Sequence, residues 1–238
     1  WPAIALVLAF GLVVGLINGY TVVRTRLPSF IVTLATFFVL QGVNAAGTLK
    51  LTGTTAIQDI DSADGFASAR HLFATDLTQY AFKVKVLWWI SLTLVGAWIL
   101  AKTRFGNWIY SAGGDPNAAR NVGVPVARTK ILLFMMTSGT AALMGVIEAL
   151  ELRSMQAKEG IGLEFIFIIC AVVGGCLLTG GFGSVIGAFF GAAMLGMVQL
   201  GIVDAQWDSN WTYTFQGAIL FAAVLLNLFV RNRAQKTR

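Results

Sequence analysis

Charged side chains are scarce in this sequence. Asp, Glu, Lys and Arg make up 12% of its 238 residues, whereas 57% are hydrophobic, and the mean hydropathy is +0.76. An average soluble domain carries about 25% charged residues, so a water-soluble globule of this length has too few charges here to cover its surface. The composition therefore excludes a soluble enzyme, a disordered chain and a disulfide-rich scaffold.

Cysteine and histidine are also rare, and several catalytic motifs are missing. The two cysteines, Cys170 and Cys176, lie within an apolar stretch and are typical of small packing residues. No Gly-Lys dipeptide occurs, so there is no Walker A loop for a nucleotide, and neither H-E-x-x-H nor G-x-S-x-G is present. We therefore expect no catalytic residue, no metal site and no cofactor bound by this chain, and we interpret the single histidine, His71, as a solvated loop residue.

Long apolar runs are abundant instead. A helix needs about 20 mostly apolar residues to cross the hydrocarbon core of a membrane, and about seven stretches come close to that length. They are residues 3–23, 28–47, 86–101, 131–150, 161–180, 183–203 and 212–230. The alternating pattern of barrel strands is absent. The sequence therefore predicts an all-α, polytopic bundle of about seven spans that forms one transmembrane domain over residues 1–238.

Lys and Arg are distributed unevenly over the loops between these runs. Of the 17 basic residues, the larger share falls on the side of the C-terminus: Arg24, Arg26, Lys102, Arg104, Arg120, Arg128, Lys130, Arg231, Arg233, Lys236 and Arg238. The positive-inside rule makes that side cytoplasmic, and parity across the spans puts Trp1 on the outer side. Residues 48–85 then form an outer segment with one or two short surface helices, and residues 102–130 form a cytoplasmic loop. We therefore interpret the net charge of +6 as a result of basic residues on the cytoplasmic side, and not as a sign of nucleic-acid binding.

The cytoplasmic loop contains the signals of one short helix. Asp115 is a favourable N-cap, and Pro116 suits the first helical position. Ala118 and Ala119 extend the helix, and Gly123 can end it in a left-handed conformation. Such a small-faced helix suits docking in a groove of another protein, whereas an ordinary helix on the membrane surface is the alternative. The candidate docking residues are Gly106, Gly114, Asp115, Pro116, Ala118, Ala119, Arg120 and Gly123.

Two further patterns lie within the apolar runs. A polar stripe at helical spacing in the second run suits the path of a neutral, hydrogen-bonding solute, and hydrogen bonds between helices are the alternative. It consists of Ser29, Thr33, Thr36, Gln41 and Asn44. Gly183, Gly187 and Gly191 recur at every fourth residue, which favours close packing of the fifth and sixth runs as a tight hairpin.

Ionisable residues are absent from the middle of the predicted spans. Glu148 and Glu164 lie close to span ends, where a charge reaches the interface easily. A transporter without a coupling carboxylate and without a nucleotide site of its own is either passive or driven by a partner.

Three stretches of the sequence together resemble a known family. Residues 27–36 (LPSFIVTLAT), 113–120 (GGDPNAAR) and 174–184 (GGCLLTGGFGS) are similar to motifs in permease subunits of sugar ATP-binding-cassette importers of the ribose, xylose and fructose type. That group lies in the superfamily that also holds branched-chain amino acid permeases. Its members usually begin with helices that are missing before Trp1, so we expect this sequence to be part of a longer chain.

The resemblance implies a multi-pass subunit of the bacterial inner membrane that works as a homodimer. It also implies a cytoplasmic ATPase, which binds the ATP, and a periplasmic or lipid-anchored sugar-binding protein. Within this sequence it assigns the helix at residues 115–122 as the coupling helix that contacts the ATPase. A permease for branched-chain amino acids or nucleosides, a stand-alone secondary transporter or channel, and a membrane scaffold remain as alternatives.

Overall fold

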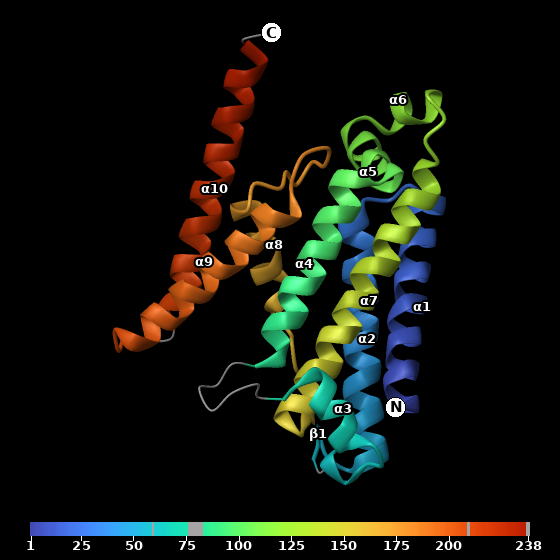
Figure 1. The fold of residues 1–238 in the computed structure, drawn as a ribbon, viewed down its shortest axis with the longest axis vertical. Helices are drawn as coiled ribbons and strands as arrows, with labels where there is room; N and C mark the ends of the chain where they lie inside the picture. The colour runs from blue at the N-terminus through green and yellow to red at the C-terminus, as the bar shows by residue number, and fades with distance from the viewer. Residues whose placement is uncertain (59, 76–82, 209, 237–238) are drawn as a thin grey trace. The chain divides into compact units, whose positions relative to one another are not determined.

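The computed structural model describes residues 1–58, 60–75, 83–208 and 210–236, with the backbone alone for residues 226–236. The described part is predominantly helical (Figure 1), which confirms the predicted all-α class. The elements are α1 (Pro2–Thr25), α2 (Ser29–Thr52), β1 (Ala56–Ile57), η1 (Ile60–Ser62), α3 (Phe66–Phe73), α4 (Val84–Lys102), α5 (Arg104–Gly114), α6 (Pro116–Asn121), α7 (Val126–Leu152), β2 (Met155–Gln156), α8 (Leu163–Val173), α9 (Val185–Asp204) and α10 (Trp211–Lys236). Residues 59 and 76–82 of the predicted outer segment, and Arg238 of the basic tail, lie outside the described residues.

Five of the described helices, α1, α2, α4, α7 and α9, are long and apolar enough to cross a membrane. In α10 the described apolar part covers Trp211–Leu225. The predicted span at residues 161–180 is not one continuous helix, because α8 has 11 residues and ends at Val173. At about 1.5 Å per residue, α8 covers about half of a hydrocarbon core that is about 30 Å thick. The predicted count of seven spans is therefore not confirmed.

Glycines explain why the helix stops where the apolar run continues. Gly175, Gly180 and Gly181 have φ angles of 87°, 84° and 79°, which side-chain-bearing L-residues rarely adopt. The Leu177 amide donates to the Phe182 carbonyl at 3.1 Å and closes a turn between them. Residues 174–184 therefore form a loop, although they continue the apolar run that begins at residue 161.

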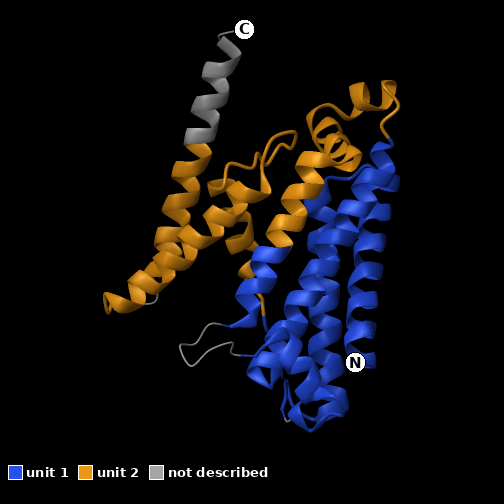
Figure 2. Cartoon of the chain, viewed as in Figure 1, with its two compact units in different colours: residues 1–91, 125–159 blue, residues 92–124, 160–238 orange. Residues whose placement is uncertain are grey.

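The described chain divides into two compact units (Figure 2), residues 1–91 with 125–159 and residues 92–124 with 160–238. In the first unit α1 lies along α7. A Cβ added at Gly15 would lie 2.6 Å from the Met135 Cα, and Gly11 and Gly19 make similarly close approaches to α7. Gly11, Gly15 and Gly19 recur at every fourth residue, which is the spacing of Gly183, Gly187 and Gly191. Sequence reasoning missed this pattern in α1.

A small apolar core lies where α3 packs on the last turns of α7. Its buried residues are Ala69, Phe73, Ala74, Val146, Ile147 and Leu150. Phe73 stacks on Trp88 with ring centroids 5.3 Å apart. The pair β1–β2 joins Ala56 to Gln156 in antiparallel register nearby in the same unit. The short helix α3 confirms that residues 48–85 contain a surface helix.

The second unit contains α5, α6, α8, α9 and α10, and the boundary between the units falls within α4. α8 and α9 lie side by side (Figure 1), and α10 packs on both. Ile169 and Cys170 of α8 are buried with Leu195 of α9, and Ile219 and Leu220 of α10 complete this cluster. Cys170 and Cys176 are free thiols.

Candidate functional site

The short helix α6 begins as the sequence predicts. Asp115 precedes it, and its Oδ1 accepts hydrogen bonds from the amides of Asn117 at 2.8 Å and Ala118 at 3.1 Å. Pro116 occupies the first helical position, where its missing amide hydrogen is not needed. The first turn of α6 is therefore held by its own cap.

The end of α6 also follows the prediction. Gly123 has a φ of 85°, its amide donates to the Arg120 carbonyl, and the Val124 amide donates to the Ala119 carbonyl, both at 3.0 Å. These two bonds make a Schellman motif, which satisfies carbonyls that a helix end leaves free. A six-residue helix is too short to be stable by itself, so both caps are needed to fix its shape.

The surface of α6 is small and accessible. Ala119 is buried, whereas Ala118 and Arg120 are exposed. Val122, directly after the helix, is 79% exposed. A single exposed apolar residue is common on protein surfaces, so Val122 does not by itself indicate a partner. Sequence reasoning did not single out Val122.

The preceding residues form a second helix that the sequence analysis did not predict. The expectation of one helix in residues 102–130 is wrong, because α5 (Arg104–Gly114) precedes α6. The Thr103 hydroxyl oxygen caps α5 by accepting from the Gly106 amide at 3.1 Å. A Cβ at Gly106 would lie 2.2 Å from the Leu100 carbonyl oxygen. Gly106 therefore permits the sharp corner between α4 and α5, and it lies away from the α6 surface.

The polar stripe predicted in the second run lies on α2. The Thr36 hydroxyl lies 2.6 Å from Asn18 Oδ1 of α1, and Asn44 Nδ2 donates to the Ala157 carbonyl at 2.8 Å. These two stripe residues therefore connect α2 to other segments of the first unit. The Thr33 hydroxyl bonds to carbonyls of its own helix, those of Ser29 at 3.0 Å and Phe30 at 3.1 Å. Ser29 is exposed and Gln41 is half-buried.

The glycines of α9 face α8 at very short range. A Cβ at Gly187 would lie 2.0 Å from the Gly174 carbonyl oxygen, and one at Gly191 would lie 2.1 Å from the Cys170 carbonyl oxygen. Gly183 precedes α9, whose N-cap is Ser184, and a Cβ at Gly183 would lie 2.8 Å from Cys176 Sγ. Backbone thus approaches backbone along the α8–α9 hairpin.

Glu164 lies in the first turn of α8, close to the end of the apolar run as the sequence analysis expects. Glu164 Oε2 accepts from the Gly162 amide at 2.8 Å.

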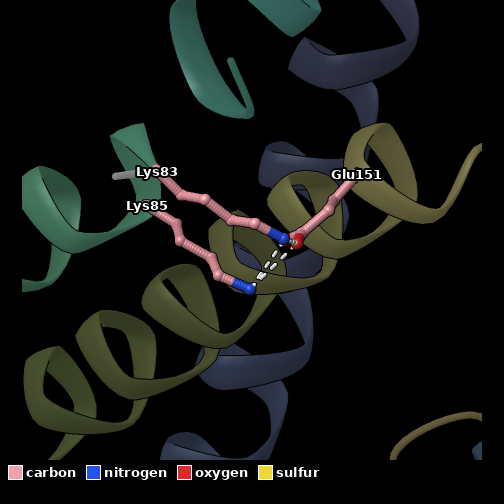
Figure 3. A network of polar contacts seen from close by, with 3 residues as sticks. All are labelled: Lys83, Lys85 and Glu151. Carbon is pink, nitrogen blue, oxygen red and sulfur yellow. Dashed lines mark hydrogen bonds and ion pairs between the residues drawn. The ribbon is translucent and has the colours of Figure 1, made fainter. Parts of the chain in front are cut away.

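Three charged residues of the first unit form a compact cluster (Figure 3). Lys83 and Lys85, at the start of α4, both bond to the carboxylate of Glu151 in the last turn of α7. The Lys85 Nζ lies 2.8 Å from Oε2 and 3.0 Å from Oε1. The Glu151 side chain is 18% exposed, so the pair of lysines compensates a partly desolvated carboxylate.

Apolar side chains cover the outside of the long helices. Phe10, Phe38, Trp98 and Phe190 are between 59% and 65% exposed. Water does not favour so much exposed aromatic surface, whereas lipid does. The long apolar helices and these side chains together define a multi-pass α-helical membrane protein.

Comparison with known proteins identifies the family. Residues 1–224 match the family described as "Branched-chain amino acid transport system / permease component". The chain belongs to this family, which consists of transport components and not of enzymes. No solved structure matched the chain significantly.

Curated relatives of the chain carry names of import permeases. The chain is 33% identical over 222 residues to the autoinducer 2 import system permease protein LsrC of Klebsiella pneumoniae, covering 92% of this chain and 60% of the relative. It is 31% identical to the galactose/methyl galactoside import permease protein MglC of Escherichia coli K12, covering 94% and 66%. It is 30% identical to the ribose import permease protein RbsC of the same strain, covering 94% and 68%. The chain spans roughly two thirds of the length of the curated relatives that it matches.

Proposed function

We propose that this chain is the membrane-spanning part of an ATP-binding-cassette importer that carries a monosaccharide across the bacterial inner membrane. The observation that carries the proposal is the doubly capped, exposed helix α6 in a chain of the permease family. The names of the ribose and galactose permeases support a sugar as the solute. The family description also mentions branched-chain amino acids, which makes an amino acid the second candidate.

The proposed mechanism is mechanical. Two copies of the permease bind two cytoplasmic ATPase domains, and α6 of each copy docks in a groove of the ATPase. Closure of the ATPase pair on ATP displaces α6 and tilts the helices, so that the path opens alternately to the two sides. A binding protein delivers the sugar from outside. ATP is bound by the partner, so this chain supplies no catalytic group.

The proposal requires α6 and the C-terminus to face the cytoplasm. The uneven distribution of Lys and Arg supports this orientation. The same rule puts Lys83 and Lys85, in the predicted outer segment 48–85, on the outer side. A cysteine introduced at exposed Asn117 is expected to react with a membrane-impermeant maleimide only in inside-out vesicles.

The polar stripe of α2 is proposed to line the sugar path. Its residues are Ser29, Thr33, Thr36, Gln41 and Asn44. Hydroxyl and amide groups suit a neutral solute with many hydroxyls, since each lost water contact needs a replacement. The stripe residues without a bond to another segment are the better candidates for direct contact, whereas Thr36 and Asn44 also hold α2 in place.

We expect Thr33→Val to lower sugar uptake while the amount of permease in the membrane stays unchanged. The hydroxyl of Thr33 bonds only locally, so its loss removes a polar contact in the path without loosening the unit. Thr36→Val is the matched comparison, because it also breaks the contact with Asn18 and is expected to lower the amount of folded protein. Unchanged uptake in Thr33→Val would mean that this residue does not contact the sugar.

Competition in cells tests the choice of substrate. Cells that depend on the complete permease for uptake receive labelled ribose or galactose with an excess of unlabelled leucine. A sugar importer takes up a labelled sugar, and leucine does not compete. Uptake of labelled leucine, with no uptake of either sugar, would favour the amino acid alternative.

A further inference from the structure

The last residues of α5 are glycines, and their backbone lies directly against the glycine backbone of the loop between α8 and α9. A Cβ added at Gly113 would lie 2.5 Å from the Gly181 nitrogen, and one at Gly180 would lie 2.9 Å from the Gly113 carbonyl oxygen. A Cβ at Gly181 would lie 2.8 Å from the Gly114 Cα. Real Cβ atoms essentially never approach a heavy atom below 3.0 Å, so none of these three positions accepts a side chain without movement of the backbone. We call these four glycines the glycine joint.

A side-chain hydrogen bond fixes the same contact one turn earlier. The Tyr110 hydroxyl of α5 donates to the Gly183 carbonyl at 2.8 Å. Gly183 directly precedes Ser184, the N-cap of α9, whose hydroxyl oxygen accepts from the Gly187 amide at 2.9 Å. The bond from Tyr110 therefore ends at the first turn of α9.

No linker separates the C-terminal end of α5 from α6. Asp115 is at once the residue that ends α5 and the N-cap of α6. Its amide donates to the Ser111 carbonyl at 3.2 Å, and its carboxylate holds the first turn of α6. A displacement of α6 therefore reaches α5 without a flexible linker that would absorb it.

We propose that the glycine joint transmits the movement of α6 to the α8–α9 hairpin during transport. The inference rests on the proposed function, in which α6 receives the displacement from an ATPase. Backbone packed on backbone has no rotamer that can change to absorb a shift, and packed interiors are nearly incompressible. α8 and α9 are in turn packed through Gly174 and Gly187, so the hairpin moves as one body. Tyr110 and Gly113 are positioning residues in this scheme.

Two glycines of the second unit offer a matched pair of substitutions. Gly113→Ala places a methyl group against the backbone of Gly181, which cannot yield without opening the joint. Gly196→Ala makes the same chemical change in α9, outside the joint, where an added Cβ meets nothing within 4 Å. Gly180 and Gly181 are unsuitable, because their φ angles of 84° and 79° would strain any alanine.

Tyr110→Phe gives a second, milder test. It keeps the aromatic ring and removes only the hydroxyl that bonds to Gly183. The glycine contacts stay in place, so this variant is expected to fold and to loosen the joint only in part.

The experiment uses the complete permease with its ATPase subunits and binding protein in proteoliposomes. Labelled ribose or galactose taken up and ATP hydrolysed are measured together, with the amount of ATPase subunit retained by the purified permease. We expect Gly113→Ala to lower the sugar transported per ATP by about fivefold or more, the size of a typical coupling free energy. Tyr110→Phe is expected to lower the ratio by about twofold, since one net hydrogen bond is lost. Gly196→Ala keeps the original ratio, and all three variants retain the ATPase subunit.

The proposal is overturned if Gly113→Ala transports the same amount of sugar per ATP as Gly196→Ala. Loss of the ATPase subunit from Gly113→Ala would also overturn it, because the joint would then act on docking. If Gly113→Ala does not accumulate in the membrane, the ratio of Tyr110→Phe decides, and an unchanged ratio overturns the proposal. Absence of ATP-dependent uptake by the unaltered complex would contradict the proposed function itself. That outcome differs from failure of the further inference alone. In that case the complex transports sugar with ATP, but substitutions in the joint leave the sugar transported per ATP unchanged.

Discussion

At the scale of single residues, Asp115 determines where α5 ends and where α6 begins. Its carboxylate accepts two amide hydrogen bonds at the start of α6, and the residue also ends α5. This cap could be predicted from the sequence, because the residues that start and end the helix lie close together in the chain. Aspartate before proline, followed by alanines and a glycine, predicts both ends of the helix without reference to the rest of the fold.

We expect Asp115→Ala to weaken the association with the ATPase subunit. Loss of an N-cap costs about 1 kcal/mol, and in a six-residue helix this is enough to unwind the first turn. Asp115→Asn is the control, because asparagine caps helices about as well as aspartate. The measurement is the fraction of ATPase subunit that copurifies with the permease. Equal retention by the two variants would show that the cap does not support docking.

Glu164 lies near the end of its apolar run, as the sequence predicted. The run begins at residue 161 and α8 begins at Leu163, so Glu164 is in the first turn of the helix. Membership of the permease family does not favour the alternative of a stand-alone secondary transporter.

We expect Glu164→Leu to destabilise the permease more than Glu164→Gln does. The Glu164 carboxylate accepts from the Gly162 amide, and a glutamine carbonyl can accept in its place, whereas leucine leaves the donor unpaired. An unpaired buried donor costs about 1–3 kcal/mol, and the half-buried Gly162 amide falls at the low end of that range. Each kcal/mol changes the Tm by about 2–4 °C in a protein of this size. Thermal unfolding in detergent measures the difference. Identical Tm values for the two variants would exclude a stabilising role for this bond.

Among the elements, α5 and α8 differ most from the sequence prediction. α5 carries the apolar pattern Phe105, Trp108, Ile109 and Ala112, which suits one face of a helix. Its three glycines lower the helix propensity, so the pattern was passed over. α8 was overextended because apolar residues such as Leu177 and Leu178 follow Val173, and only the glycines indicated the turn. Both errors arise where tertiary contacts with glycine backbone override local preference.

The α8–α9 hairpin gives the sharpest test at this scale. Gly191→Ala would put a methyl group 2.1 Å from the Cys170 carbonyl oxygen and 2.9 Å from the Gly174 nitrogen. Overpacking of this kind costs about 1–3 kcal/mol. Gly196→Ala, in the same helix, meets nothing within 4 Å and is expected to leave the Tm unchanged or slightly raised. If Gly191→Ala and Gly196→Ala had the same Tm, the close packing of the hairpin would be contradicted.

For the whole molecule, scarce charge and long apolar runs were sufficient to predict the class. They predicted an all-α membrane protein, and the order of three motifs indicated the permease family, which the family match confirms. The number of spans was not predictable in the same way, since an apolar run of 20 residues can hold half a helix and a loop. The identity of the solute could not be predicted from such patterns either, because hydroxyl and amide groups in α2 suit many neutral solutes.

The central claim is that ATP drives import through this permease, and uptake into proteoliposomes tests it most directly. The complete permease is reconstituted with its ATPase subunits, and the binding protein and labelled ribose or galactose are added outside. The account predicts sugar accumulation against a gradient only when ATP is available to the ATPase side, and none when the binding protein is omitted. Sugar flux through the permease alone, without ATP or partners, would contradict it.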